Sequence, residues 1–141
     1  MGFNSSNGSA VNTSSTALTN AGIKSLSEVT NPRSYIMLRF SDRRVTDLKG
    51  LQLFKNLAEL NVSGNFLQGE IPELQELPFL KKLNLSNNGI ENLCTLPPNL
   101  EILNLSYNRI KNLKADATLN LKSLSTLDVT QNGLETLQGV E

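Results

Sequence analysis

The sequence predicts an α/β fold: a right-handed solenoid whose short parallel strands form one sheet on the concave face. Two observations carry this prediction. Residues 80–90 read Leu-Lys-Lys-Leu-Asn-Leu-Ser-Asn-Asn-Gly-Ile, and the same pattern of leucines followed by an asparagine returns at 57–67, 100–110 and 124–134. Within each copy, apolar and outward residues alternate as they do in a half-buried strand. One coil cannot bury its own apolar face, so the copies are expected to stack.

The chain opens with a segment that is expected to be a flexible arm. Residues 1–12 are rich in Ser and Asn and carry no charged side chain. They have too little to bury to offset the entropy lost on ordering. Gly2 and Ser6 fit the N-myristoylation pattern, with a chance match as the alternative. A single myristoyl chain binds membranes only weakly, so membrane contact is expected only if Gly2 carries that lipid.

The repeat domain is expected to fill residues 13–141 and to begin with a degenerate coil that caps the solenoid. Residues 18–26 align without a gap with residues 85–93, and Ala21 stands where Asn88 does. A polar outer repeat of this kind is what a solenoid needs at its end. Five recognisable repeats follow, and the first of them is predicted to point Tyr35, Leu38 and Phe40 inward.

Four asparagines are predicted to form a structural ladder across the coils. Each follows a strand and occupies the bend, where a buried side-chain amide can bond main-chain groups that the turn leaves unpaired. The spacing of the ladder sets a repeat length of roughly 22 residues. The ladder residues are Asn65, Asn88, Asn108 and Asn132.

The return segments are predicted to be short 3-10 helices, helical turns or extended chain on the convex face. Between residues 45 and 57, apolar residues recur at every third position, which suits a 3-10 helix with one buried face. Prolines at 72, 97 and 98 predict extended segments or short turns in later returns. The chain stops part-way through the last return, which indicates a fragment of a longer protein or an edge that something else covers.

These motifs resemble the leucine-rich repeat consensus, and the leucines at every third position after each asparagine are similar to the intracellular subfamily with repeats of roughly 22 residues. That subfamily includes the protein phosphatase-one regulator, the axonemal dynein light chain and the spliceosomal A-prime subunit. The resemblance covers residues 13–141. It implies a protein-binding scaffold in a cytoskeletal, ciliary or phosphatase-regulatory assembly. Residues 93–100 depart from the pattern, because their Leu-Pro unit looks like bacterial effector repeats.

Composition argues against several kinds of site. The chain has no His and one Cys, Cys94, so neither a disulfide framework nor an all-protein zinc site is expected. There is no phosphate-cradling glycine loop, so we expect no catalytic residues, no metal and no cofactor. The absence of cysteine-paired caps favours a reducing, cytoplasmic setting, with the cytoskeleton, the cilium and the nucleus left open.

The outward strand positions are expected to form the surface that a partner protein meets on the concave face. The serine and asparagine columns of this surface are largely repeat consensus and are expected to have a structural or neutral role. Residues that depart from the consensus are the better candidates, because exposed aromatic, Met and Arg side chains are enriched at interface centres. Ordinary surface variation is the alternative. The predicted partner-binding residues are Met37, Arg39, Lys82, Ile102 and Tyr107.

The predicted function is a non-enzymatic scaffold that binds a helix or an extended peptide of a partner protein. One alternative is a subunit of an RNA particle that holds phosphate through the cluster Arg33, Arg39, Arg43 and Arg44. No aromatic stacking platform accompanies these arginines and the net charge is zero, so nucleic acid is the less favoured partner. A second alternative is a bacterial-effector-like recognition domain.

Overall fold

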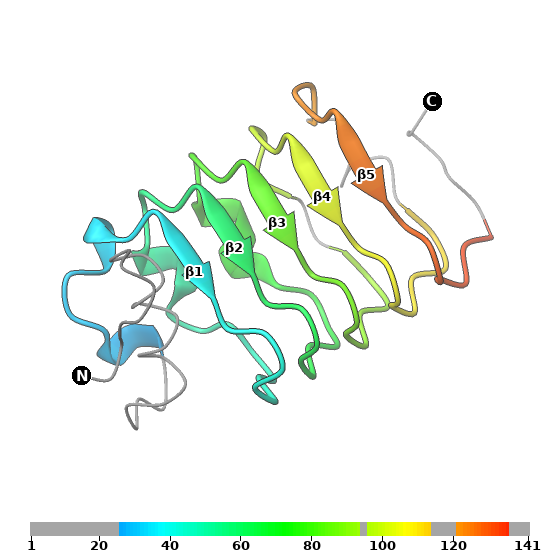
Figure 1. The fold of residues 1–141 in the computed structure, drawn as a ribbon, viewed down its shortest axis with the longest axis horizontal. Coiled ribbons are helices and arrows are strands. Elements are labelled where there is room, and N and C mark those ends of the chain that lie inside the picture. The colour runs from blue at the N-terminus through cyan, green and yellow to red at the C-terminus, as the bar shows by residue number, and fades with distance from the viewer. Residues whose placement is uncertain (1–25, 94–95, 114–120, 136–141) are drawn as a thin grey trace.

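The computed structural model describes residues 26–93, 96–113 and 121–135, and these form a solenoid with one parallel sheet. Its five strands lie side by side in chain order (Figure 1). They are β1 (Met37–Arg39), β2 (Glu59–Asn61), β3 (Lys82–Asn84), β4 (Ile102–Asn104) and β5 (Thr126–Asp128). Each of the first four strands pairs in parallel with the strand one coil later, so the predicted solenoid of stacked strands is confirmed.

The middle residue of every strand is a leucine that points into the core. The register sets Leu38, Leu60, Leu83 and Leu103 opposite one another, and all four are buried. Burying a leucine side chain contributes about 1.5–3 kcal/mol, so the stacking of identical leucines is a main source of stability. Leu127 of β5 continues the row but is only partly buried.

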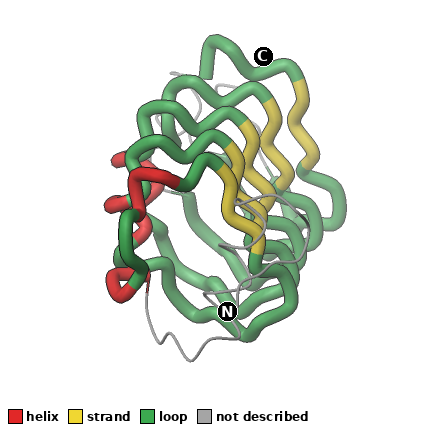
Figure 2. The backbone as a smooth tube through the Cα atoms, turned by 60° about the vertical axis from the view of Figure 1, so that its left-hand side comes forward, coloured by secondary structure: helices red, strands yellow, loops and turns green. Residues whose placement is uncertain are grey.

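The return segments lie on the side of the solenoid away from the strands, and Figure 2 shows the helices gathered there. Among the described residues, 3-10 helices occur before β1 and in the returns after β1 and β2, whereas the later returns hold none, in agreement with the prediction of short 3-10 or extended connections. The helices are η1 (Leu26–Glu28), η2 (Pro32–Ser34), η3 (Leu51–Leu53) and η4 (Pro72–Glu76).

The return through η3 shows why apolar residues recur there at every third position. Leu48, Leu51, Phe54 and Leu57 are all buried. The main-chain N–H groups of Leu51, Phe54 and Leu57 each donate to the carbonyl three residues earlier, at 3.0, 3.0 and 3.1 Å. A 3-10 winding places every third side chain on one face, so this return presents one continuous apolar stripe to the core.

Pro72 was expected in an extended segment or a short turn, and instead it is the first residue of the five-residue helix η4. The first helical residue has no intrahelical partner for its N–H, and the fixed φ of proline suits the helix, so proline is tolerated at that point. The segment around Pro98 does form a turn without a helix.

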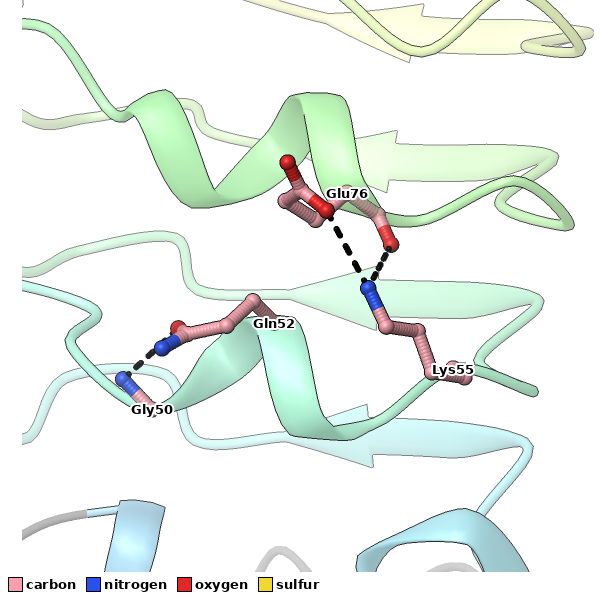
Figure 3. Close-up of polar contacts among 4 residues, drawn as sticks. All are labelled: Gly50, Gln52, Lys55 and Glu76. Atoms are coloured by element: carbon pink, nitrogen blue, oxygen red, sulfur yellow. Dashed lines mark hydrogen bonds and ion pairs between the residues drawn. The ribbon is translucent and has the colours of Figure 1, made fainter.

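Polar contacts join neighbouring returns on this side (Figure 3). The Lys55 ammonium group donates to the Glu76 main-chain carbonyl at 3.1 Å and lies 3.2 Å from the Glu76 carboxylate. Within one return, the Gly50 N–H donates to the Gln52 side-chain carbonyl at 3.0 Å. Gly50 has φ +96°, a conformation that only glycine adopts easily, so the entry to η3 depends on this residue.

The four ladder asparagines lie in the bends that follow β2 to β5. Asn108 is buried; its carbonyl accepts from the Ile90 N–H at 3.1 Å, and its amide donates to the carbonyls of Leu85 and Leu105 at 3.0 and 2.9 Å. Asn65, Asn88 and Asn132 accept from a main-chain N–H and donate to main-chain carbonyls in the same way. Each asparagine therefore satisfies main-chain groups of its own coil and of the preceding coil.

Several sequence predictions lie outside the described residues. They are the arm 1–12 with Gly2, the cap coil as far as residue 25, and Cys94. In the part of the chain that is described, none of the helices has the length and apolar character needed to cross a membrane.

Candidate protein-interaction surface

The strand register gathers two outward columns of side chains into one surface, which we call the sheet face. One column precedes the central leucine of each strand and the other follows it. The first column is Met37, Glu59, Lys82, Ile102 and Thr126, and the second is Arg39, Asn61, Asn84, Asn104 and Asp128. Four of the five predicted partner-binding residues thus share this face.

Glu59 occupies the centre of the charged part of the sheet face. Its carboxylate lies 3.7 Å from the Arg39 guanidinium and 3.6 Å from the Lys82 ammonium group. Sequence reasoning placed Arg39 and Lys82 at the interface but missed the carboxylate that both of them contact. Exposed ion pairs of this kind add little stability, so they mainly fix where the two cations point.

In the asparagine column, the side-chain oxygens bond the main chain and the side-chain nitrogens face outward. The side-chain carbonyls of Asn61, Asn84 and Asn104 accept from the main-chain N–H two residues later, at 3.0, 2.9 and 2.9 Å. No described residue accepts a hydrogen bond from their side-chain Nδ2 atoms. No buried side-chain nitrogen or oxygen among the described residues lacks a partner, so these Nδ2 atoms reach solvent. The column was expected to have a structural or neutral role, and the hydrogen bonds to its oxygens are structural.

Asp128 ends this column with a carboxylate. The main-chain N–H and then the hydroxyl of Thr130 donate to it at 3.0 and 2.8 Å, and these bonds lower the pKa of the Asp128 carboxyl. Because the lowered pKa belongs to the folded state, the stabilisation is present above the ordinary carboxyl pKa and is lost as the pH falls through the lowered one. At neutral pH the column therefore has a cation at Arg39 and an anion at Asp128.

A turn follows each strand, and its third residue past the strand has a left-handed backbone. We call these residues the turn column. Their φ angles lie between 54° and 68°, and each of the first four N–H groups donates to a carbonyl of the next coil. The members are Asp42, Gly64, Asn87, Tyr107 and Gln131.

Tyr107 is the aromatic member of the turn column. Gly, Asn and Asp enter the left-handed region readily, whereas for a bulky aromatic residue it is an outlier. Its φ is 56° and the residue is 59% exposed, three positions after the end of β4. Ile102 of β4 is also exposed, at 37%. Two large apolar side chains of the same coil are thus available to a partner.

The predicted arginine cluster is spread over three elements. Arg33 is on η2, Arg39 is on β1, and Arg43 and Arg44 lie in the turn that follows β1. Arg39 forms an ion pair with Glu59 on the sheet face. Only Arg43 and Arg44 share an element, although all four arginines are close in sequence.

Comparisons with known proteins agree with the repeat architecture. A family model described as leucine-rich repeat matches residues 97–140, and a second, described as leucine-rich repeats in two copies, matches residues 55–97. Mimecan of Homo sapiens is 32% identical over 107 residues, which make up 74% of this chain and 36% of Mimecan. Acidic leucine-rich nuclear phosphoprotein 32 family member A of Drosophila pseudoobscura pseudoobscura is 38% identical over 103 residues, with coverages of 67% and 38%.

Solved structures show the same fold. The leucine-rich repeat domain of APL1B matches with a TM-score of 0.65 at 19% identity, over 72% of this chain and 32% of that one. The chain spans about a third of the length of Mimecan and of the nuclear phosphoprotein. Both matching models are repeat families, and repeat families of this type are typically non-catalytic. The two models together reach from residue 55 to residue 140, over half of the sequence. The chain is a leucine-rich repeat protein, and domains of this family are generally protein-interaction modules.

Proposed function

We propose that the sheet face binds an extended segment of a partner protein, which crosses the strands from β1 to β5. The observation that carries this proposal is the row of Nδ2 donors on Asn61, Asn84 and Asn104, which reach solvent and have no acceptor among the described residues. Neighbouring parallel strands are about 4.8 Å apart, so the row offers a donor at each of three successive steps.

A row of donors favours an extended partner over a helical one. The carbonyl groups of an α-helix already accept hydrogen bonds within the helix, so a bound helix offers mainly its side chains. An extended segment has main-chain carbonyls that need donors, and the Nδ2 atoms supply them. The sequence analysis allowed either a helix or an extended peptide as the partner segment. The donor row supports the extended peptide.

The charges at the two ends of the row give the partner a direction. Arg39 on β1 favours an acidic group, and Asp128 on β5 favours a basic one. Four strand steps cover about 19 Å, or about six extended residues. Ile102 and Tyr107 would then receive an apolar side chain of the partner near β4, since both are exposed.

The experiment begins with selection of peptides from a random displayed library against the folded chain, followed by measurement of the Kd of a selected peptide. Asn84→Asp and Asn104→Asp keep the oxygen that accepts the N–H of Ser86 or Ser106 and remove the Nδ2 donor. Asp128 already fills an equivalent position in the same column. We expect each variant to weaken binding about fivefold to tenfold, because a hydrogen bond contributes about 1 kcal/mol.

Asn87→Asp is the matched control. It adds the same charge in the turn column, where Asp42 is tolerated, and it leaves the donor row intact. Binding should change much less in this variant than in Asn84→Asp. If no peptide is selected, or if all three variants bind equally well, the sheet face does not act through these donors.

We also propose that the chain functions in the cytoplasm, as a member of the intracellular leucine-rich repeat subfamily. The roughly 22-residue repeat and the single cysteine, which leaves this chain without an internal disulfide, support the proposal. The name of the Drosophila relative places that protein in the nucleus, so the two compartments should be compared directly. The distribution of a fluorescent fusion tests this, and a secreted fusion would contradict it.

A further inference from the structure

Two ladder asparagines in the described part of the chain are followed by glycine: Asn88 by Gly89, and Asn132 by Gly133. An Asn-Gly pair can lose ammonia without an enzyme, because a glycine nitrogen has no neighbouring side chain to hinder its attack on the asparagine side chain. The two pairs occupy the same place in their coils, so any difference between them comes from their surroundings.

The surroundings of the two glycines differ. The Gly89 N–H donates to the Leu67 carbonyl at 2.8 Å, and a Cβ atom at Gly89 would meet Gln68 Cγ at 3.4 Å and the Leu67 carbonyl oxygen at 3.5 Å. The Gly133 N–H donates to none of the described residues, and a Cβ atom there would meet nothing within 4 Å. Phe66 and Arg109 hold the Gly89 position in their own coils, and both donate to the preceding coil at 2.8 and 2.9 Å. Gly133 alone in this series, among the described residues, lacks that bond.

The coil around Asn132 is also packed less tightly than the inner coils. Asn88 and Asn132 are both half-buried, but Gly89 is half-buried whereas Gly133 is exposed. Leu127 and Val129 of the same coil are only partly buried. Regions with few buried contacts open locally at low free energy, and opening is what the attack requires.

We propose that Asn132 is a site of spontaneous deamidation and that Asn88 is protected by the fold. The Gly133 nitrogen gives up its proton and attacks Asn132 Cγ, the bond from Cγ to Nδ2 breaks, and Nδ2 leaves as ammonia. Water then opens the resulting five-membered imide and gives aspartate or isoaspartate. Water is the only co-reactant, and no redox change occurs.

The product no longer fits the ladder. Asn132 Nδ2 donates to the carbonyls of Leu105, Val129 and Thr130 at 2.9, 3.0 and 3.3 Å. A carboxylate would direct a negative oxygen at these three acceptors, so the coil that holds β5 is loosened. Deamidation itself does not depend on the proposed function. Its effect on a partner does, because β5 carries Asp128.

The test is prolonged incubation of the folded chain at mildly alkaline pH, followed by proteolysis and mass measurement of the peptides. In the folded protein we expect the Asn132 peptide to gain the deamidation mass about tenfold faster than the Asn88 peptide. In concentrated urea the two rates should be equal, because the sequence context is the same Asn-Gly. Equal rates in the folded protein, or faster reaction at Asn88, would overturn the proposal.

The variant Gly133→Ala provides a second test of the proposal. The space around Gly133 is open and its φ is not positive, so alanine is expected to fold normally and to slow the reaction. Unchanged deamidation at Asn132 in this variant would also overturn the proposal. Asn132→Asp should lower the Tm. If deamidation is seen but peptide binding is unaffected by it, the proposed function fails at β5 while the modification site stands.

Discussion

Tyr107 holds a backbone conformation that costs free energy for an aromatic side chain. The other members of the turn column include Asp42, Gly64 and Asn87, residue types that adopt positive φ with little strain. A strained residue with an exposed ring is a reason to suspect a role in binding, because strain of this kind gathers at functional sites. A substitution at Tyr107 is therefore expected to affect stability and binding in opposite directions.

Tyr107→Asn should therefore raise the free energy of unfolding by about 1 kcal/mol, because asparagine tolerates the left-handed region. The same variant should weaken binding of a peptide selected on the wild-type sheet face. Urea unfolding and the Kd of that peptide measure the two effects.

Asn87→Gly controls for the position, since asparagine and glycine both accept its φ, and its stability should barely change. A Tyr107→Asn protein that is less stable than the wild type would show that the ring packs favourably and that the strain does not dominate.

At the scale of the element, the returns show how far a pattern of spacing predicts structure. The apolar residues at every third position between 45 and 57 predicted a 3-10 return with one buried face, and η3 has that form. Pro72 was misjudged, because its effect depends on its place in the helix and not on its presence in the segment.

Leu51 and Leu53 of η3 offer a matched pair of substitutions. Leu51 is fully buried and Leu53 is 41% exposed. Leu51→Ala should lower the free energy of unfolding by about 2–5 kcal/mol, the usual cost of a cavity, and Leu53→Ala should cost well under that amount. Equal losses in chemical unfolding would mean that the helix does not orient the two side chains as described.

The sheet face was predictable in outline and not in detail. Strand positions, their outward columns and the ladder asparagines all follow from the repeat, because its period fixes which residues stack. The contacts of Glu59 with Arg39 and Lys82 depend on side-chain conformations across neighbouring strands, and the repeat spacing in the sequence does not determine these conformations. In the turn column, Asp42, Gly64 and Asn87 are residue types that favour a left-handed backbone, so the sequence contained evidence for these turns. Tyr107 is not such a residue, and it interrupts the pattern.

Over the whole molecule, stability is expected to be a sum of contacts between neighbouring coils. Leu83 and Leu103 are buried between coils on both sides, whereas Leu127 is partly buried. Protection should therefore decline toward β5 within the described residues.

Amide hydrogen exchange can measure this decline. The Leu85 N–H donates to the Asn104 carbonyl, and the Leu105 N–H donates to the Asp128 carbonyl. We expect the amide of Leu105 to exchange faster than that of Leu85, since its acceptor lies on the less buried strand. Identical rates would indicate that the solenoid opens only as a single unit.

The spacing of the stacked donors differs from the spacing of residues in an extended peptide. Coils advance by about 4.8 Å and an extended peptide by about 3.3 Å per residue, so the two periods disagree at each single step. Two coils, at about 9.6 Å, nearly equal three residues, at about 9.9 Å. A segment that lies across Asn61, Asn84 and Asn104 can thus be in phase with the first and third amides while the middle one adapts. Selectivity would then recur in the partner with a period of three residues, which a positional scan of a bound peptide would reveal.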